Sequence, residues 1–158
     1  MSSKELADEL FRNVFDDPWH GASVSMILNG ITHTAAFNKP LDSIHSIAEI
    51  LLHMTSWTVE VERRLSGEEP DEPEMGDWPD ATGLKKNNWD DIKDSYFRES
   101  EKLIGSIRVF PDSGLNELVG SERNASLGTG FTYKSMILGM IQHNAYHSAQ
   151  ISILKKIK

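Results

Sequence analysis

The sequence of 158 residues contains no cysteine. This absence excludes disulfide bonds, thiolate metal ligands and a nucleophilic cysteine within the chain. Histidine and the carboxylates are therefore the candidate metal ligands that the chain can supply, and any thiol chemistry needs a thiol from solution.

Basic residues are scarce, because 16 Lys and Arg face 24 Asp and Glu, which gives a formal net charge of −8. Such a charge opposes the approach of a polyphosphate backbone, so we expect no nucleic-acid partner. No apolar run approaches the length of a membrane span, and the polar residues 1–9 do not resemble a signal peptide. We therefore expect a cytoplasmic protein without a membrane partner.

The rest of the composition is that of an ordinary globular protein, with 39% hydrophobic and 25% charged residues. A chain of this length fits one domain with a good hydrophobic core. We find no internal repeat, glycine-rich phosphate loop or Ser-His-Asp signature. The sequence predicts a single domain over residues 1–158.

Apolar residues recur at helical spacing along most of the chain, which predicts an all-α four-helix bundle. Ser46 and Glu49 match the capping-box pattern, so one long helix begins there or a turn earlier at Asp42. The stretch 22–37 either continues the interrupted first helix or packs as a second piece across the end of the bundle. The main helices are predicted near residues 4–16 continued by 22–37, 43–66, 88–109 and 131–157.

Two long connections separate the later helices. Residues 67–87 are rich in proline and acidic side chains, and such a crossover is unneeded between adjacent antiparallel helices. It predicts that the flanking helices run parallel or that the segment covers a site. Residues 112–130 are rich in Ser, Asn and Gly, which predicts a loop with at most a short helical turn. We expect Asn88 and Thr132 to cap the helices that follow these connections.

Two histidines occupy the apolar stripe of the last predicted helix, at positions where Leu or Ile is expected. His143 and His147 are four residues apart, about 40° around the helix axis and about 6 Å along it, so both rings can reach one spot. Buried imidazoles need a partner, which is a hydrogen-bonding group, ordered water or a metal ion. A hydrogen-bonded pair of core histidines is the simpler alternative.

His53 adds a third apolar-face histidine, on the helix predicted near residues 43–66. Three imidazoles and an open position for water or substrate form a well-attested catalytic arrangement for zinc. We therefore predict that His53, His143 and His147 bind one divalent ion. A hydrogen-bonded core cluster of the same residues remains the alternative.

The other histidines are interpreted differently. His45 is about 12 Å along the helix from His53, too far to share an ion, and we expect it at the start of the helix, lining the mouth of the site. His20 and His33 lie on polar or terminal stretches, where solvent-facing or capping roles are expected.

Two function classes fit this site. In an enzyme, the ion lowers the pKa of a water or thiol and so provides the nucleophile that the chain lacks. In a structural or small-ligand-binding protein, the ion pins two helices together, and a fourth protein ligand closes the site. We also expect a homodimer, because Trp19, Phe37 and Trp89 leave apolar surface if they do not complete the monomer core.

Two motifs resemble those of the DinB-like (YfiT-type) superfamily of metal-binding four-helix bundles: residues 46–57, SIAEILLHMTSW, and residues 143–151, HNAYHSAQI. The resemblance implies an up-down-down-up bundle that is often dimeric. It also implies a divalent ion such as Zn²⁺ or Ni²⁺ on His53, His143 and His147. Some members are thiol S-transferases or isomerases that use a low-molecular-weight bacterial thiol, so the resemblance implies a small-molecule substrate. Residues 67–87 and 112–130 match nothing in this pattern.

Overall fold

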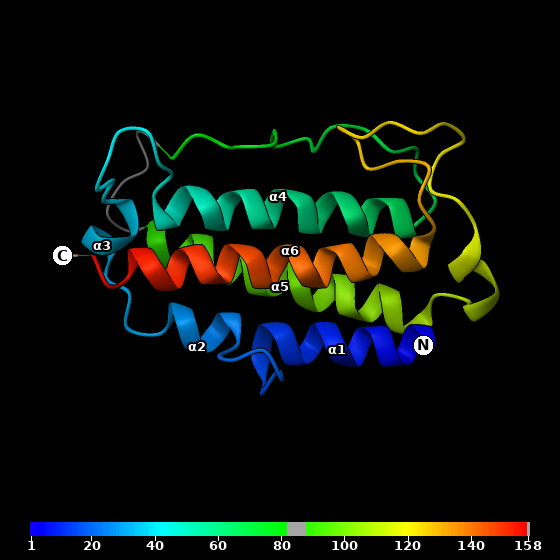
Figure 1. The fold of residues 1–158 in the computed structure, drawn as a ribbon, viewed down its shortest axis with the longest axis horizontal. Coiled ribbons are helices and arrows are strands. Elements are labelled where there is room, and N and C mark those ends of the chain that lie inside the picture. The colour runs from blue at the N-terminus through cyan, green and yellow to red at the C-terminus, as the bar shows by residue number, and fades with distance from the viewer. Residues whose placement is uncertain (82–87, 158) are drawn as a thin grey trace.

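A computed structural model describes residues 1–81 and 88–157. Four long helices lie side by side in it (Figure 1), and two short α-helices and one 3-10 helix join them. The described part of the chain has no strand, only an isolated bridge between Leu118 and Thr132. The predicted all-α class is confirmed. The elements are α1 (Ser3–Phe15), α2 (Val24–Leu28), α3 (His33–Phe37), α4 (Ile47–Leu65), α5 (Asn88–Val109), η1 (Asp112–Asn116) and α6 (Tyr133–Leu154).

Local capping explains where the long helices begin and end. In α4 the Ser46 hydroxyl accepts from the amide of Glu49, whose carboxylate accepts from the amide of Ser46. This reciprocal pair satisfies two free amides of the first turn, so of the two predicted starts the one after Ser46 is confirmed. Thr132 caps α6 as expected. Gly67, with φ at +93°, reverses the chain just after α4.

The structure differs from the predicted elements in three places. Residues 22–37 form two five-residue helices, capped separately by Ser23 and Thr32. Gly30, with φ at +73°, turns the chain between them. Asn88 is the first residue of α5 and not its cap, and α6 ends at Leu154. Residues 82–87 of the predicted crossover lie outside the described residues.

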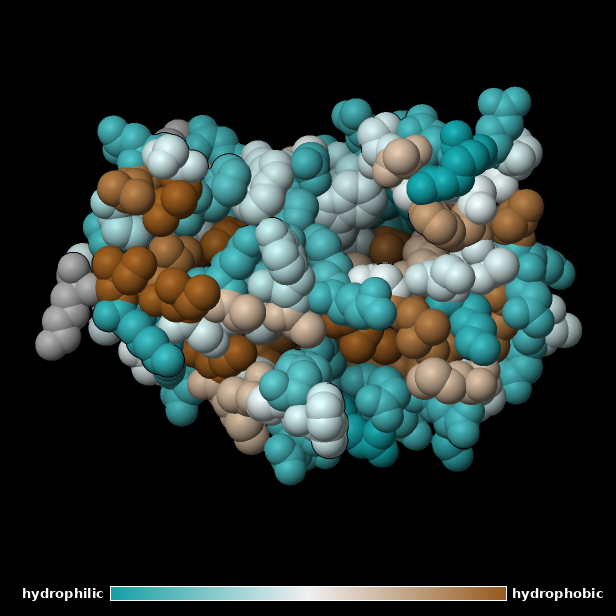
Figure 2. Space-filling model, viewed as in Figure 1, coloured by the Kyte–Doolittle hydropathy of each residue, from teal (hydrophilic) through white to brown (hydrophobic). Residues whose placement is uncertain are grey.

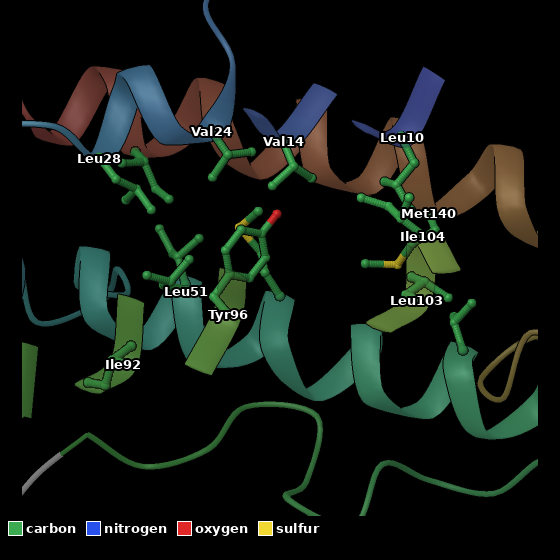
Figure 3. Packing of buried hydrophobic residues seen from close by; sticks show 14 of the residues in the cluster. Leu10, Val14, Val24, Leu28, Leu51, Ile92, Tyr96, Leu103, Ile104 and Met140 are labelled. Atoms are coloured by element: carbon green, nitrogen blue, oxygen red, sulfur yellow. The ribbon is translucent and has the colours of Figure 1, made fainter. Parts of the chain in front are cut away.

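The core forms where the long helices meet. α4 packs against α5 and α6, and α1 packs against the same two helices. Figure 3 shows apolar side chains from α1, α2, α4, α5 and α6 meeting in this interior. Each fully buried aliphatic side chain contributes about 1.5–3 kcal/mol through the hydrophobic effect. Labelled members of the cluster include Leu10, Val14, Leu51, Leu103, Ile104 and Met140.

The aromatic residues on which the dimer expectation rests have different surroundings. Trp89 is buried, and its indole donates a 2.8 Å hydrogen bond to the carbonyl oxygen of Ile31, so it completes the monomer core. Phe37 packs partly against the core and stacks on His33. Trp19 is fully exposed. The expectation that Trp89 leaves apolar surface is therefore wrong.

None of the helices described is long and apolar enough to cross a membrane.

Candidate metal centre

The three histidines predicted from the sequence come together between α4 and α6. His53 lies on α4, and His143 and His147 lie one turn apart on α6, which packs against α4. One ring nitrogen from each residue lies within 4.8 Å of the others. His53 and His147 are buried, and His143 is half-buried. A pair of neighbouring helices thus brings together residues that are 90 positions apart in the chain.

Hydrogen bonds orient two of the three rings. Nδ1 of His53 lies 2.5 Å from the carbonyl oxygen of Asp77, which can only accept, so this nitrogen carries the proton. Nδ1 of His147 lies 2.7 Å from Oε1 of Gln150, with the same consequence. Each ring therefore presents an unprotonated Nε2. Metal-bound histidines show this second-sphere pattern in general.

His143, unlike His53 and His147, has no hydrogen bond that orients its ring through Nδ1 in the described residues. Its Nε2 lies 2.9 Å from Nε2 of His53, and its Nδ1 is buried without a hydrogen-bond partner among residues 1–81 and 88–157. An N–H···N hydrogen bond between the two rings accounts for this short distance. A tetrahedral Zn²⁺ places its imidazole nitrogens about 3.3 Å apart. The cluster fits such an ion with small adjustments, because its nitrogens lie between 2.9 and 4.8 Å apart.

Burial keeps the imidazole rings of the cluster neutral, which is the form that binds metal. Burial, together with the neighbouring His147 and His53, lowers the pKa of His143 to about 3. Burial also lowers the pKa of His53 and of His147, although their hydrogen bonds to Asp77 and Gln150 oppose the shift. All three rings are therefore neutral near pH 7, and neutral imidazole is the ligand form.

Within the described residues, no fourth His, Asp or Glu side chain joins the three histidines. The candidate group contains three histidines and no Asp or Glu within the described ranges. The nearby carboxylate of Asp77 has its Oδ1 3.4 Å from Nδ1 of His53, the nitrogen that faces away from the cluster. That oxygen accepts a 2.7 Å hydrogen bond from the Trp57 indole. An ion on the three histidines would keep an open position, as catalytic zinc sites do.

The crossover covers the cluster. Its Gly76 and Asp77 carbonyls accept hydrogen bonds from Ser56 and His53 on α4. The next residue, Trp78, stacks on His53, with ring centroids 3.9 Å apart and planes 9° apart. The described part of the crossover, residues 67–81, therefore covers the histidine cluster, which agrees with the second of its two predicted roles.

His45 lies on the opposite face of Trp78. The two ring centroids are 3.7 Å apart and the planes 4° apart, so the indole is stacked between His45 and His53. His45 does not belong to the ligand group, as predicted from its position along α4. It lines a neighbouring cavity instead.

Two cavities flank the cluster. The larger, about 720 Å³, is lined by all three histidines and by α4, α6 and the loop near residue 127. The smaller, about 390 Å³, is lined by His45, Ile44, Ile153 and Leu154 among others. Trp78, Tyr146 and His147 line both and separate them. The face in Figure 2 is hollowed right of centre, over the stretch where α4 and α6 run together in Figure 1.

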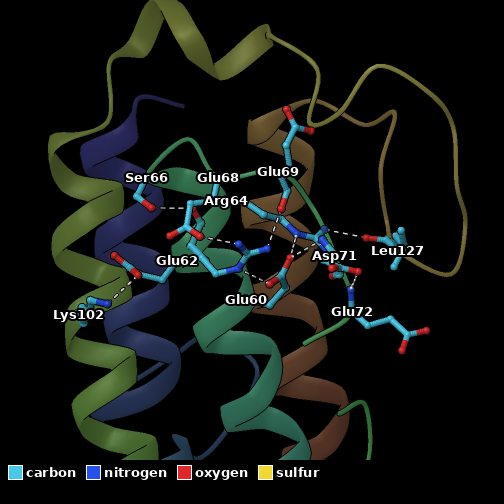
Figure 4. Close-up of polar contacts among 11 residues, drawn as sticks. Glu60, Glu62, Arg64, Ser66, Glu68, Glu69, Asp71, Glu72, Lys102 and Leu127 are labelled. Carbon is cyan, nitrogen blue, oxygen red and sulfur yellow. Dashed lines mark hydrogen bonds and ion pairs between the residues drawn. The ribbon is translucent and has the colours of Figure 1, made fainter. Parts of the chain in front are cut away.

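A buried ion pair holds the far wall of the larger cavity (Figure 4). Arg64 donates from Nε to Glu60 and from its terminal nitrogens to the carbonyls of Leu127 and Asp71, at 2.7, 2.7 and 3.1 Å. Burial raises the pKa of Glu60, but the hydrogen bonds from Arg63 and Arg64 outweigh it and hold that pKa below its usual range. This network fixes both the crossover and the Leu127 loop to the end of α4.

The remaining histidines lie away from the cluster. His20 is exposed and hydrogen-bonds to Asn13, as a solvent-facing residue. His33 is half-buried and stacks on Phe37, and Thr32 caps its helix, so a capping role for His33 is wrong.

Sequence reasoning missed several residues of the site. Gln150, three positions after His147 on the same face of the helix, was within reach of a search for second-sphere partners. The positions of Asp77 and Trp78 depend on how the crossover folds back on α4, and no local pattern signals that.

Comparison with known proteins identifies a family. The chain matches the family described as the DinB superfamily over residues 19–151, a span that includes all three clustered histidines. No curated protein and no solved structure matches the chain significantly.

Proposed function

The chain belongs to the DinB superfamily, and we propose that it is a cytoplasmic, metal-dependent transferase that joins a low-molecular-weight thiol to a small organic electrophile. One divalent ion, Zn²⁺ or Ni²⁺, is held by His53, His143 and His147. The observation that carries this proposal is that the three histidines line the wall of a large cavity and that no fourth His, Asp or Glu side chain of the described residues joins them. A purely structural ion needs neither an open position nor a cavity.

In the proposed reaction, the sulfur of the thiol forms a bond to a carbon of the electrophile while the bond from that carbon to the leaving group breaks. The leaving group departs with the electron pair, and the thiol proton passes to solvent. A bound divalent ion lowers the pKa of a thiol that it contacts and so supplies the nucleophile at neutral pH.

The chain's own residues perform the positioning. Asp77 and Gln150 fix the tautomers of His53 and His147 so that the unprotonated nitrogens face one point. Trp78 covers the cluster on one side and restricts access of water. The apolar walls of the larger cavity then hold the organic substrate beside the histidines.

Hydrolysis is the less supported reaction. It needs a general acid or base beside the nucleophile, and the candidates that the sequence offers are His45 and the carboxylates of the crossover. His45 faces the smaller cavity, on the other side of the Trp78 indole from His53. Thiol transfer does not require such a group.

The test is turnover by the metal-loaded protein. We expect it to consume an electrophile in the presence of a bacterial low-molecular-weight thiol, measured as loss of both reactants and gain of the thioether. His147→Ala should abolish turnover with helical content retained, whereas His20→Ala, at the exposed surface, should retain it. Absence of thiol- and water-dependent turnover across a broad electrophile and ester panel would remove the enzyme proposal.

The alternative is a non-catalytic bundle that the ion stabilises. One observation favours it: His53 on one helix and His143 and His147 on another would be joined by the ion, which pins α4 to α6. In that case removal of metal lowers the melting temperature, and the protein shows no turnover.

We also propose an up-down-down-up bundle. In Figure 1, α4 and α5 start at the end of the molecule where the chain terminates, and α1 and α6 run in the opposite direction. The parallel α4 and α5 agree with the long crossover between them.

We further propose a homodimer. Figure 2 shows hydrophobic side chains gathered over the end of the molecule that holds the C-terminus, and Leu41, Ile153 and Ile157 in that region are exposed. Exposed apolar surface of this kind favours association. Light scattering at micromolar concentration should give twice the chain mass, and a monomer mass would contradict the dimer.

A further inference from the structure

The larger cavity extends along the bundle away from the histidines. Its lining on α4 runs from His53 through Trp57 and Val61 to Arg64, a span of roughly 16 Å at the rise of an α-helix. The lining on α6 runs in the opposite chain direction, from His143 back to Ser135. The cavity is therefore an elongated slot with the candidate metal ligands at one end.

The lining of this slot is unusual for a protein with a net charge of −8. It includes no Asp or Glu among the described residues, and its one charged side chain is Arg64. The Arg64 guanidinium is buried and already bonded to Glu60, Leu127 and Asp71. The slot thus presents apolar and aromatic walls, which suit a neutral apolar ligand.

One position on α6 leaves the slot open beside the histidines. Gly139 lines the slot one turn before His143, and a Cβ built on it meets no atom within 4 Å. Helical side chains lean toward the N-terminus, so the His143 ring lies over the turn that contains Gly139. Glycine inside a helix costs about 1 kcal/mol relative to alanine. Gly139 is solvent-exposed, so its importance rests on its place in the slot, where a side chain would extend into the space between α4 and α6 beside the histidines.

We propose that the slot is the binding site for the organic substrate, a neutral electrophile with an extended aryl or alkyl body, and that Gly139 determines how large this body can be. The body lies over Gly139 between α4 and α6, and its reactive end reaches the histidines. The position of the reactive end rests on the proposed function. The existence of the slot and the effect of residue 139 on its size do not depend on the proposed function.

Gly105 supplies a matched control. Like Gly139 it is an exposed residue inside a long helix, and a Cβ built on it also meets nothing within 4 Å, but it lies on α5 and does not line the slot. Substitution at residue 105 therefore reproduces the effect on helix propensity without changing the slot.

The experiment measures binding of two neutral probes, benzyl alcohol and 2-naphthalenemethanol, by calorimetry without any thiol. We expect Gly139→Leu to weaken naphthyl binding at least tenfold and benzyl binding less than threefold. Gly105→Leu should change neither. Equal weakening of both probes, or no weakening, by Gly139→Leu would overturn the assignment.

A second variant covers the case in which leucine at position 139 prevents folding. Gly139→Ala adds only the Cβ that meets no atom, so it should fold and weaken naphthyl binding about threefold while benzyl binding is unchanged. Unchanged naphthyl binding in a folded Gly139→Ala would overturn the proposal in that case.

The outcome is separable from that of the transferase test. If the residue 139 variants discriminate between the two probes but the protein shows no turnover, the transferase proposal fails and the binding-slot proposal stands. If the protein turns over substrate but the residue 139 variants bind both probes as the wild type does, the binding-slot proposal fails and the transferase proposal stands.

Discussion

The α1–α5 side of the bundle and the seam between α4 and α6 bury different kinds of side chain. On the first side the buried residues are mainly apolar, among them Leu6, Leu10, Val14, Leu103 and Ile107. Along the seam they include the candidate ligands His53 and His147 beside the larger cavity, whereas buried polar atoms without a partner in the described chain occur on both sides, at Asn13, Tyr96 and Ser100 as well as at His143. Buried titratable groups beside a cavity mark a candidate binding site, because burial shifts their pKa and the cavity can admit a ligand. The difference indicates that the first side supplies stability and that the seam is built for binding.

A truncation on the apolar side should produce the largest change in stability. Leu103→Ala removes a side chain that is 1% exposed, and we expect the free energy of unfolding to fall by about 2–5 kcal/mol. By contrast, Ser148→Ala on α6 removes a buried hydroxyl without a partner in the described chain and should change the free energy of unfolding by less than about 1 kcal/mol. Urea unfolding of the metal-free protein measures both variants, and comparable losses would contradict the larger contribution of the apolar side chains.

Disruption of a second-sphere contact should affect metal affinity rather than stability. Gln150→Leu removes the acceptor that orients the His147 ring, and the affinity for Zn²⁺ should fall about 10–100-fold. The metal-free protein should unfold as the wild type does. Gln142→Leu, at an exposed position on the same helix, is the matched control. Equal affinities of the two variants, measured by competition with a chelator, would show that Gln150 has no such role.

Acid should weaken the metal-free protein through the same seam. Because the folded pKa of His143 is about 3, below its ordinary value, its contribution to stability is complete above about pH 6.5 and is lost as pH falls. Between pH 7 and pH 5 the loss through this residue is roughly 2 kcal/mol. His143→Leu should reduce the pH dependence by that amount. Urea unfolding at pH 7 and at pH 5 measures this dependence. If the wild type and the variant lose the same free energy of unfolding between these two pH values, the lowered pKa of His143 is contradicted.

The sequence was sufficient for the long helices and for the histidine cluster because both depend on periodicity. The apolar stripes fixed α5 at residues 88–109, and the capping pattern of Ser46 and Glu49 fixed the start of α4. His53, His143 and His147 stood out because they occupy positions on those stripes.

Other features depend on long-range packing, which periodicity does not report. The stretch 22–37 has helical spacing throughout, but Gly30 adopts a positive φ and splits it. The stacking of Trp78 between His45 and His53 and the slot over Gly139 arise only when the crossover and α6 meet α4.

The most direct test of the central claim is the metal content of the purified protein. Protein prepared without chelators or immobilised-metal columns should contain about one Zn²⁺ or Ni²⁺ per chain by elemental analysis, and His143→Ala should contain almost none. Added Zn²⁺ should raise the melting temperature of the metal-free wild type and leave that of the variant unchanged. A wild type without metal, whose melting temperature does not respond to Zn²⁺ or Ni²⁺, would show that the three residues are a hydrogen-bonded core cluster and contradict the account.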